Sequence, residues 1–179
     1  MDQNVSYDQI KGSVGSLLLL WSAIERAARD EVARTNGGTL PKAAHGVGAA
    51  IKAWEASISA RRSQESFRAL LASALCSQLR PSLDIRNGVC HGLVGVSAAH
   101  SGQQAALSWE INGGKHEITW DELQAMFRWL SKVPAAISII SVSSSQKAGS
   151  RLVDTLENRK WWLNEYGLDL LGPNLAVAL

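Results

Sequence analysis

The stretch that decides the fold class is residues 13–34, SVGSLLLLWSAIERAARDEVAR. Large apolar side chains recur along it every three or four positions, and charged residues such as Glu25, Arg26, Arg29 and Asp30 lie between them. This is the spacing of one face of an α-helix. The apolar positions are Leu17, Leu20, Trp21, Ile24, Ala28 and Val32. The stretch therefore predicts an amphipathic helix, which Asn36-Gly37-Gly38 ends.

Two further helices are expected after it. Thr39 and Pro41 are a helix-start signal, and the second helix then runs through Ile51, Trp54 and Ile58. A polar break over residues 59–63 precedes the third helix. Its expected inward side chains are Phe67, Leu70, Leu71, Ala74 and Leu75.

Arg80-Pro81-Ser82 predicts a break or kink, because proline lacks a backbone donor and disfavours helix in the residue before it. Ser82 can then cap a new helical segment that ends near Gly92. Residues 92–104 are rich in Gly, Ser and Gln and are expected to form a loop.

Residues 106–120 carry the pattern of a β-hairpin. Apolar and polar residues alternate on both sides of Asn112-Gly113-Gly114, a sequence typical of a tight hairpin turn. Thr119 and Glu122 have capping-box spacing and open a helix that Pro134 is expected to kink. A last helix is expected over residues 150–166, after Ser143-Ser144-Ser145. The prediction is an all-α antiparallel helical bundle with a small inserted hairpin, in one domain over residues 1–179 with the last helix as an extension.

The residues that carry chemistry lie in Asp84-Ile85-Arg86-Asn87-Gly88-Val89-Cys90-His91-Gly92. Arg86 is a permanent cation whose planar fork matches phosphate oxygens. The ordinary pKa of a histidine lets His91 give or take a proton near neutral pH. A cation and a proton-transfer group at this spacing favour chemistry on a phosphodiester.

The spacing of Arg86 and His91 resembles the Arg-x4-6-His motif of HEPN domains. The run Ile-Arg-Asn-x-x-x-His-Gly is typical of that family, and the pattern Leu-Leu-x-Trp-Ser-x-Ile-Glu over residues 18–25 matches a helix that HEPN domains usually have near the N-terminus. The resemblance implies a metal-independent endoribonuclease that acts on RNA as a homodimer, with two motifs facing one cleft. Arg86, Asn87 and His91 would be the catalytic residues, and Glu25 a supporting one. No metal or cofactor is implied.

The resemblance also implies a role in defence, stress response or a toxin–antitoxin system, with an antitoxin protein as partner in the last case. Many toxin members carry a Tyr shortly after the His, whereas Gly92-Leu93-Val94 follows His91 here. This difference weakens the toxin–antitoxin version.

Several alternatives stay open at this point. The chain could be a catalytically inactive HEPN-like domain that binds RNA, nucleotides or protein. The motif could also be accidental, with His91 packed at a helix end and Arg86 solvated. Glu25 could be exposed or ion-paired. Gly88 and Gly92 lie four apart and would let another backbone approach closely, or else serve tight internal packing and a helix end. Trp161 and Trp162 could pack in a core or interface, or stack on a base.

Composition limits the class of protein without naming the function. The chain is 46% hydrophobic and has a formal net charge of +2. Its cysteines, Cys76 and Cys90, are too few for a disulfide framework and lack metal-ligand spacing. Residues 26–91 hold ten Lys or Arg against five Asp or Glu, a bias typical both of phosphate binding and of solvated helices. Without a signal peptide or membrane span, a cytoplasmic protein is expected.

Overall fold

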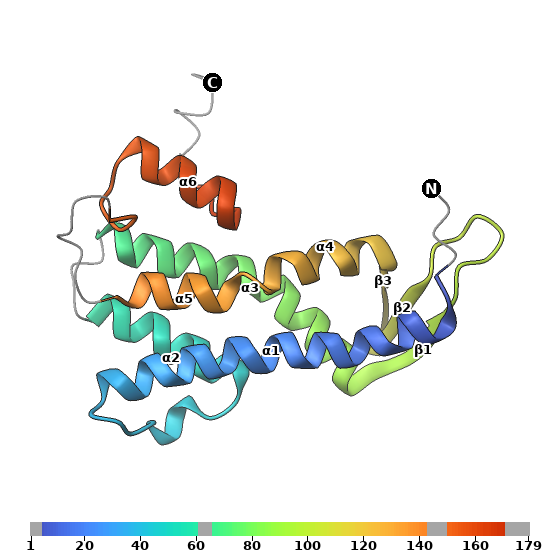
Figure 1. Cartoon of the computed structure of the whole chain (residues 1–179). Coiled ribbons are helices and arrows are strands. Elements are labelled where there is room, and N and C mark those ends of the chain that lie inside the picture. The colour runs from blue at the N-terminus through green and yellow to red at the C-terminus, as the bar shows by residue number, and fades with distance from the viewer. Residues whose placement is uncertain (1–4, 61–65, 143–149, 171–179) are drawn as a thin grey trace. The chain divides into compact units, whose positions relative to one another are not determined.

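The computed structural model describes residues 5–60, 66–142 and 150–170 of the chain. Over these ranges the protein is mostly helical and contains one small antiparallel sheet (Figure 1). The elements are α1 (Tyr7–Thr35), the short 3₁₀ helix η1 (Lys42–Ala44), α2 (Val47–Ala60), α3 (Phe67–Gly92), β1 (Leu93–Ser97), β2 (Ala106–Ile111), β3 (Gly114–Thr119), α4 (Trp120–Leu130), α5 (Val133–Ser141) and α6 (Leu156–Tyr166).

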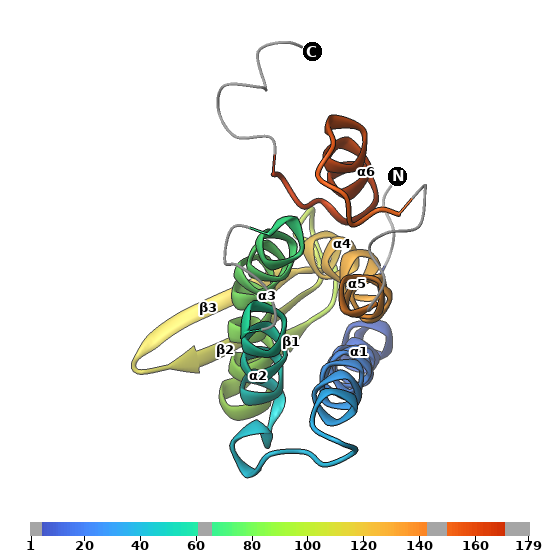
Figure 2. The same ribbon diagram turned by 90° about the vertical axis from the view of Figure 1, so that its left-hand side faces the viewer.

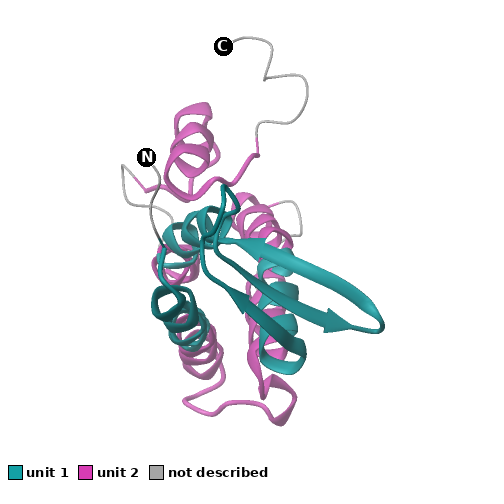
Figure 3. Ribbon diagram, turned by 90° about the vertical axis from the view of Figure 1, so that its right-hand side faces the viewer, with its two compact units in different colours: residues 1–22, 80–131 teal, residues 23–79, 132–179 magenta. Residues whose placement is uncertain are grey.

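The chain divides into two compact units (Figure 3). Unit 1 comprises residues 1–22 and 80–131, and unit 2 comprises residues 23–79 and 132–179. The first half of α1 and the second half of α3 belong to unit 1, and the remaining halves belong to unit 2. The expectation of one domain over the whole chain stays a prediction.

Unit 1 is built around the three-stranded sheet, whose order is β1-β2-β3. The predicted hairpin is confirmed: β2 and β3 pair from Ala106↔Thr119 to Ile111↔Gly114. Asn112 and Gly113, between them, have φ values of 53° and 76°. Two positive φ angles in a two-residue loop match the twist of the strands, which explains the Asn-Gly sequence. Leu107, Trp109 and Ile118 are buried on one face of the hairpin.

Reciprocal capping pairs mark the starts of two helices, α4 and α1, in unit 1. The predicted capping box of α4 is confirmed, because the Thr119 side chain accepts from the Glu122 N–H and the Glu122 carboxylate accepts from the Thr119 N–H. At α1, Ser6 and Gln9 form the same reciprocal pair, with the Ser6 N–H donating to Gln9 Oε1 at 2.8 Å. This second box starts α1 at Tyr7, before the predicted start at residue 13.

The regular elements that the structure describes in unit 2 are all helices. Ser141 of α5 joins two other helices, because its Oγ accepts from Trp54 Nε1 of α2 at 2.8 Å and its carbonyl accepts from Arg34 of α1 at 3.0 Å. The N-terminal half of α3 contributes Leu71, Leu75 and Leu79 to the core of this unit. The prediction that Leu70 faces inward is wrong, since its side chain is 40% exposed.

The helix that carries the motif does not begin at residue 82. α3 runs continuously from Phe67 to Gly92 with Pro81 inside it. Pro81 cannot donate to the carbonyl four residues before it, which typically costs about 3 kcal/mol in a helix interior. Residues on both sides of it, Leu79 and Ser82, are buried. We attribute the continuity to this burial, which opposes the cost of the proline.

The predicted loop after Gly92 contains a strand. β1 pairs with β2 from Leu93↔Trp109 to Ser97↔Ala106, and the register shifts between Leu93 and Gly95. The rest of that stretch follows the prediction, since His100 and Gln103 form only an isolated bridge. β1 is short and contains Gly95, so its pairing depends on contact with β2 more than on its own sequence.

Three boundaries also differ from the sequence-based expectation. Pro41 precedes η1, and α2 begins only at Val47. In place of one helix kinked at Pro134, α4 ends at Leu130 and α5 begins at Val133 with Pro134 in its first turn. α6 begins at Leu156, capped by Thr155, and ends at Tyr166 as expected. The predicted end at Ser143-Ser144-Ser145 lies outside the described residues.

Candidate functional site

The Arg-His motif lies at the C-terminal end of α3, in unit 1. His91 is in the last turn of the helix, Gly92 is its last residue, and β1 starts directly after it (Figure 1). Within this turn Val89 is 3% exposed, whereas His91 is exposed. The helix therefore packs through Val89 and presents His91 to solvent.

Arg86 and Asn87 are joined to each other. The guanidinium of Arg86 donates from Nη1 to Oδ1 of Asn87 at 3.0 Å, and both residues are half-buried. Arg86 Nε is buried and has no hydrogen-bond acceptor within the described part of the chain. A buried donor without a partner costs about 1–3 kcal/mol. Asn87 thus holds the guanidinium of Arg86 through Nη1, while the Nε donor of Arg86 stays without an acceptor among the described residues.

Helix geometry places Asn87 and His91 on one face. They lie four residues apart, so their directions differ by about 40°, whereas Arg86 and His91 differ by about 140°. The Arg86–Asn87 hydrogen bond turns the arginine toward the face that carries His91. With Oδ1 engaged by Arg86, the Asn87 amide keeps its Nδ2 hydrogens as donors.

Gly88 and Gly92 are covered by the hairpin of the same chain. The place where a Cβ of Gly88 would stand is occupied by the indole of Trp109, and the corresponding place at Gly92 is occupied by the carbonyl oxygen of Glu110. Figure 2 looks along the helices and shows the β2–β3 hairpin extending to the left from α3. Gly88 and Gly92 therefore allow close packing of α3 on β2. This is the tight internal packing that the sequence offered as one of two interpretations.

Trp109 also contacts the neighbouring strand. Its indole stacks on the imidazole of His116, with ring centroids 5.7 Å apart and planes inclined by 16°. The two residues are a cross-strand pair, so they lie on the same face of the hairpin. Trp109 is 6% exposed, and His116 is exposed. The sequence favours a surface or structural role for His116 on the hairpin, and only the register shows that Trp109 is its partner.

Glu25 lies in unit 2 and has its own partner. Its carboxylate accepts from Arg29 Nη1 at 3.4 Å, one turn along α1. This is the ion-paired alternative that the sequence left open. Its supporting role at the motif stays a prediction.

The basic excess does not belong to the unit that holds the motif. Unit 1 contains five Lys or Arg against seven Asp or Glu, a formal balance of −2. Unit 2 contains thirteen against nine, a balance of +4. Eight of the ten cations counted over residues 26–91 fall in unit 2. Arg86 is therefore a cation in an otherwise slightly acidic unit.

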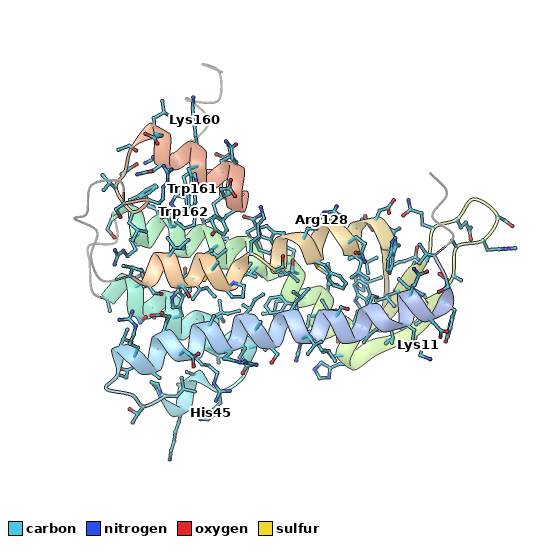
Figure 4. The ribbon with its side chains drawn as sticks, in the orientation of Figure 1. Lys11, His45, Arg128, Lys160, Trp161 and Trp162 are labelled. Carbon is cyan, nitrogen blue, oxygen red and sulfur yellow. The ribbon has the colours of Figure 1, made fainter. Side chains whose placement is uncertain are left out.

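The two adjacent tryptophans of α6 have different surroundings in unit 2. Trp162 is fully buried, and its Nε1 donates to the carbonyl of Arg151 at 2.8 Å. Trp161 is half-buried, and the Arg151 guanidinium lies 5.1 Å from its ring centroid. Figure 4 labels both rings on α6, with Lys160 on the other side of that helix. Trp162 is thus a core residue, and a cation of the same chain already covers Trp161.

The other two histidines and the two cysteines differ in exposure. His45 and His100 are exposed, Cys76 is half-buried and Cys90 is exposed. No group of three or more metal-ligating side chains comes together in the described ranges. Among the described helices, none combines the length and the apolar character that crossing a bilayer requires.

Comparison of the chain with family models, with curated proteins and with solved structures gave no match. The resemblance to HEPN domains therefore rests on the residues of the motif and of α1.

Proposed function

We propose that this protein is a metal-independent endoribonuclease of HEPN type, with Arg86, Asn87 and His91 as its catalytic residues and a homodimer as its active form. The observation that carries the proposal is the hydrogen-bonded Arg86–Asn87 pair on a helix turn that also exposes His91. A cation held in place and a solvent-accessible imidazole are two of the groups that RNA cleavage without a metal uses.

The chemistry is an attack by the ribose 2′-oxygen on the adjacent phosphorus. A histidine acting as base takes the 2′-hydroxyl proton while the P–O5′ bond breaks, and an acid gives a proton to the departing 5′-oxygen. The products are a 2′,3′-cyclic phosphate and a 5′-hydroxyl. Because one imidazole cannot be base and acid at the same moment, His91 supplies one role and His91 of a second copy supplies the other.

Arg86 and Asn87 act on the phosphate. The guanidinium holds a non-bridging oxygen and offsets the negative charge that develops in the transition state. Asn87 fixes the guanidinium through Oδ1 and offers its amide hydrogens to a second phosphate oxygen. Glu25 would support the site, and the biological setting would be defence, stress response or a toxin–antitoxin pair in the cytoplasm.

A second candidate is a HEPN-like domain without catalysis that binds RNA, nucleotides or another protein. The formal charge of unit 1 favours the protein-binding form of this candidate, because an acidic balance lowers the electrostatic attraction of RNA or nucleotide phosphates to this unit. It predicts binding that does not depend on His91 and no turnover.

The test is incubation of a mixed RNA pool with wild type, His91→Ala and His100→Ala in the presence of EDTA. His100 is the matched control, because it is an exposed histidine of the same unit outside the motif. A positioned acid or base contributes roughly 10²- to 10⁴-fold in rate, so His91→Ala should lose cleavage by that factor while His100→Ala keeps it. Equal cleavage by His91→Ala and wild type would refute the assignment. If none of the three proteins cleaves the RNA but each still binds RNA or another protein, the result would favour the second candidate.

A further inference from the structure

We infer that the stacked pair Trp109–His116 is a platform for an unpaired RNA base next to the scissile phosphate. The inference rests on the proposed function and adds a substrate-binding residue, His116, to the candidate site. It comes from three observations in unit 1: a buried indole, an exposed imidazole parallel to it, and contact of the indole with the motif helix.

Trp109 is held in a fixed position. The indole fills the space over Gly88, and the neighbouring carbonyl of Glu110 fills the space over Gly92. With 6% of its surface exposed, Trp109 has little freedom to turn. The stack is therefore anchored to α3 at the residue that follows Asn87.

His116 is the accessible layer of the stack. One side of its ring lies parallel to the indole at 5.7 Å between centroids. Its Nε2 is 3.3 Å from where a Cβ of Gly114 would stand, so the glycine leaves room for the ring in this orientation. His116 is exposed and β3 is an edge strand of the sheet, so no further strand of this sheet lies on the side of the imidazole away from Trp109.

The position of the stack relative to the motif follows from the helix. Around α3, Val89 lies about 100° to one side of Gly88 and is buried, whereas His91 lies about 60° to the other side and is exposed. On the solvent-facing side of the contact between Trp109 and Gly88, the helix therefore carries His91 and Asn87. Trp109 contacts α3, His116 stacks on Trp109, and an RNA base would stack on the outer side of His116.

The ligand class follows from the chemistry of the surface. A planar ring backed by a second ring binds any base through its face, with little dependence on sequence. A paired base in a duplex has both faces covered by its neighbours, so the platform takes single-stranded RNA. The remaining neighbours on β3, Lys115 and Glu117, are of opposite charge and point to the other face of the hairpin.

The test measures RNA affinity in a His91→Ala background, in which the RNA stays intact. Anisotropy of a labelled single-stranded RNA gives Kd for the His91→Ala protein and for His116→Ala, His116→Phe and His100→Ala added to it. Loss of base stacking should weaken binding about 5- to 10-fold for His116→Ala. His116→Phe, which keeps a ring, and His100→Ala should bind as the parent does. An abasic nucleotide at one position of the RNA should weaken the parent by the same factor and leave His116→Ala unchanged.

The outcomes separate this inference from the proposed function. If wild type cleaves RNA and the His116→Ala affinity equals that of the parent, the platform is wrong and the endoribonuclease stands. If His116→Ala and His116→Phe lose affinity equally and the abasic effect persists in both, His116 acts on hairpin structure and the inference also falls. Wild type that neither binds nor cleaves RNA overturns both proposals. Thermal melting of each variant shows that the proteins compared are folded.

Discussion

The indole of Trp109 occupies the space over Gly88, so a side chain cannot be added at residue 88 without moving a buried ring. This relationship links the hairpin to the helix turn that carries Arg86, Asn87 and His91. It makes Gly88 the residue at which the packing of unit 1 and the candidate site can be tested together.

Gly88→Ala should destabilise the protein by about 1–3 kcal/mol, because the new methyl group forces the indole or the helix to shift. Gly12→Ala is the matched control, since Gly12 is also helical, belongs to unit 1 and has no atom within 4 Å of its Cβ position. That control should stabilise by about 0.5–1 kcal/mol through helix propensity. Urea unfolding of both variants gives the values. A Gly88→Ala protein as stable as Gly12→Ala would contradict the packing described here.

Arg86 and Asn87 should behave as one unit. Because Asn87 accepts from the Arg86 guanidinium, part of the effect of Asn87→Ala is lost orientation of the arginine. We expect cleavage to fall about 10-fold in Asn87→Ala and further in Arg86→Ala, with the double variant close to Arg86→Ala alone. Rates of a double-mutant cycle on one RNA check this. Multiplicative losses would show that the two side chains act independently.

The ion pair between Asp154 and Arg159, in unit 2, predicts a dependence of stability on pH. Hydrogen bonds from Arg159 Nε at 2.6 Å and Nη2 at 2.8 Å lower the pKa of Asp154 below its usual value near ~4. The folded state therefore favours the carboxylate form of Asp154, and the pair stabilises the protein at pH values above the usual pKa of an aspartate. The contribution is lost as the pH falls through the lowered pKa.

Asp154→Asn should accordingly lower the free energy of unfolding by about 0.5 kcal/mol at pH 7, a small value because Asp154 is 46% exposed. The difference from wild type should shrink as the pH falls through the lowered pKa of Asp154. Glu157→Gln is the control, because Glu157 is 84% exposed in its pair with Arg151. Melting curves of wild type and both variants, recorded from neutral to acidic pH, measure this difference in stability. A difference between Asp154→Asn and wild type that stays constant at every pH would exclude the ion pair as its source.

Thr119→Ala removes the cap of α4 and should cost about 1 kcal/mol. The Thr119 N–H and hydroxyl both donate to the Glu122 carboxylate, which lowers the pKa of Glu122. Thr119→Ser keeps a hydroxyl at the same position and should retain most of the stability. Equal losses in Ala and Ser would mean that the methyl group, rather than the cap, carries the effect. Chemical unfolding of the two variants separates these results.

Local signals were the reliable part of the sequence. The Asn112-Gly113 turn and the Thr119–Glu122 box are decided by residues within a few positions of one another, and both form as expected. The Ser6–Gln9 box was equally readable and was missed because the apolar pattern starts later, at Leu17.

Features that depend on distant contacts could not be read in the same way. Proline at 81 argues for a break, but α3 is continuous there, and we attribute this to the burial of Leu79 and Ser82 on both sides of it. β1 is a strand because β2 lies beside it. At the site, helix spacing placed Asn87 and His91 on one face, but no local signal shows that Trp109 fills the space over Gly88.

The most direct measurement of the central claim is the chemistry of the ends formed when wild type and His91→Ala act on one single-stranded RNA in EDTA. We expect wild type to leave 2′,3′-cyclic phosphate and 5′-hydroxyl ends, and His91→Ala, folded to the same extent, to form them at least 100-fold more slowly. Ends bearing a 3′-hydroxyl and a 5′-phosphate, or equal rates for the two proteins, would contradict cleavage by His91.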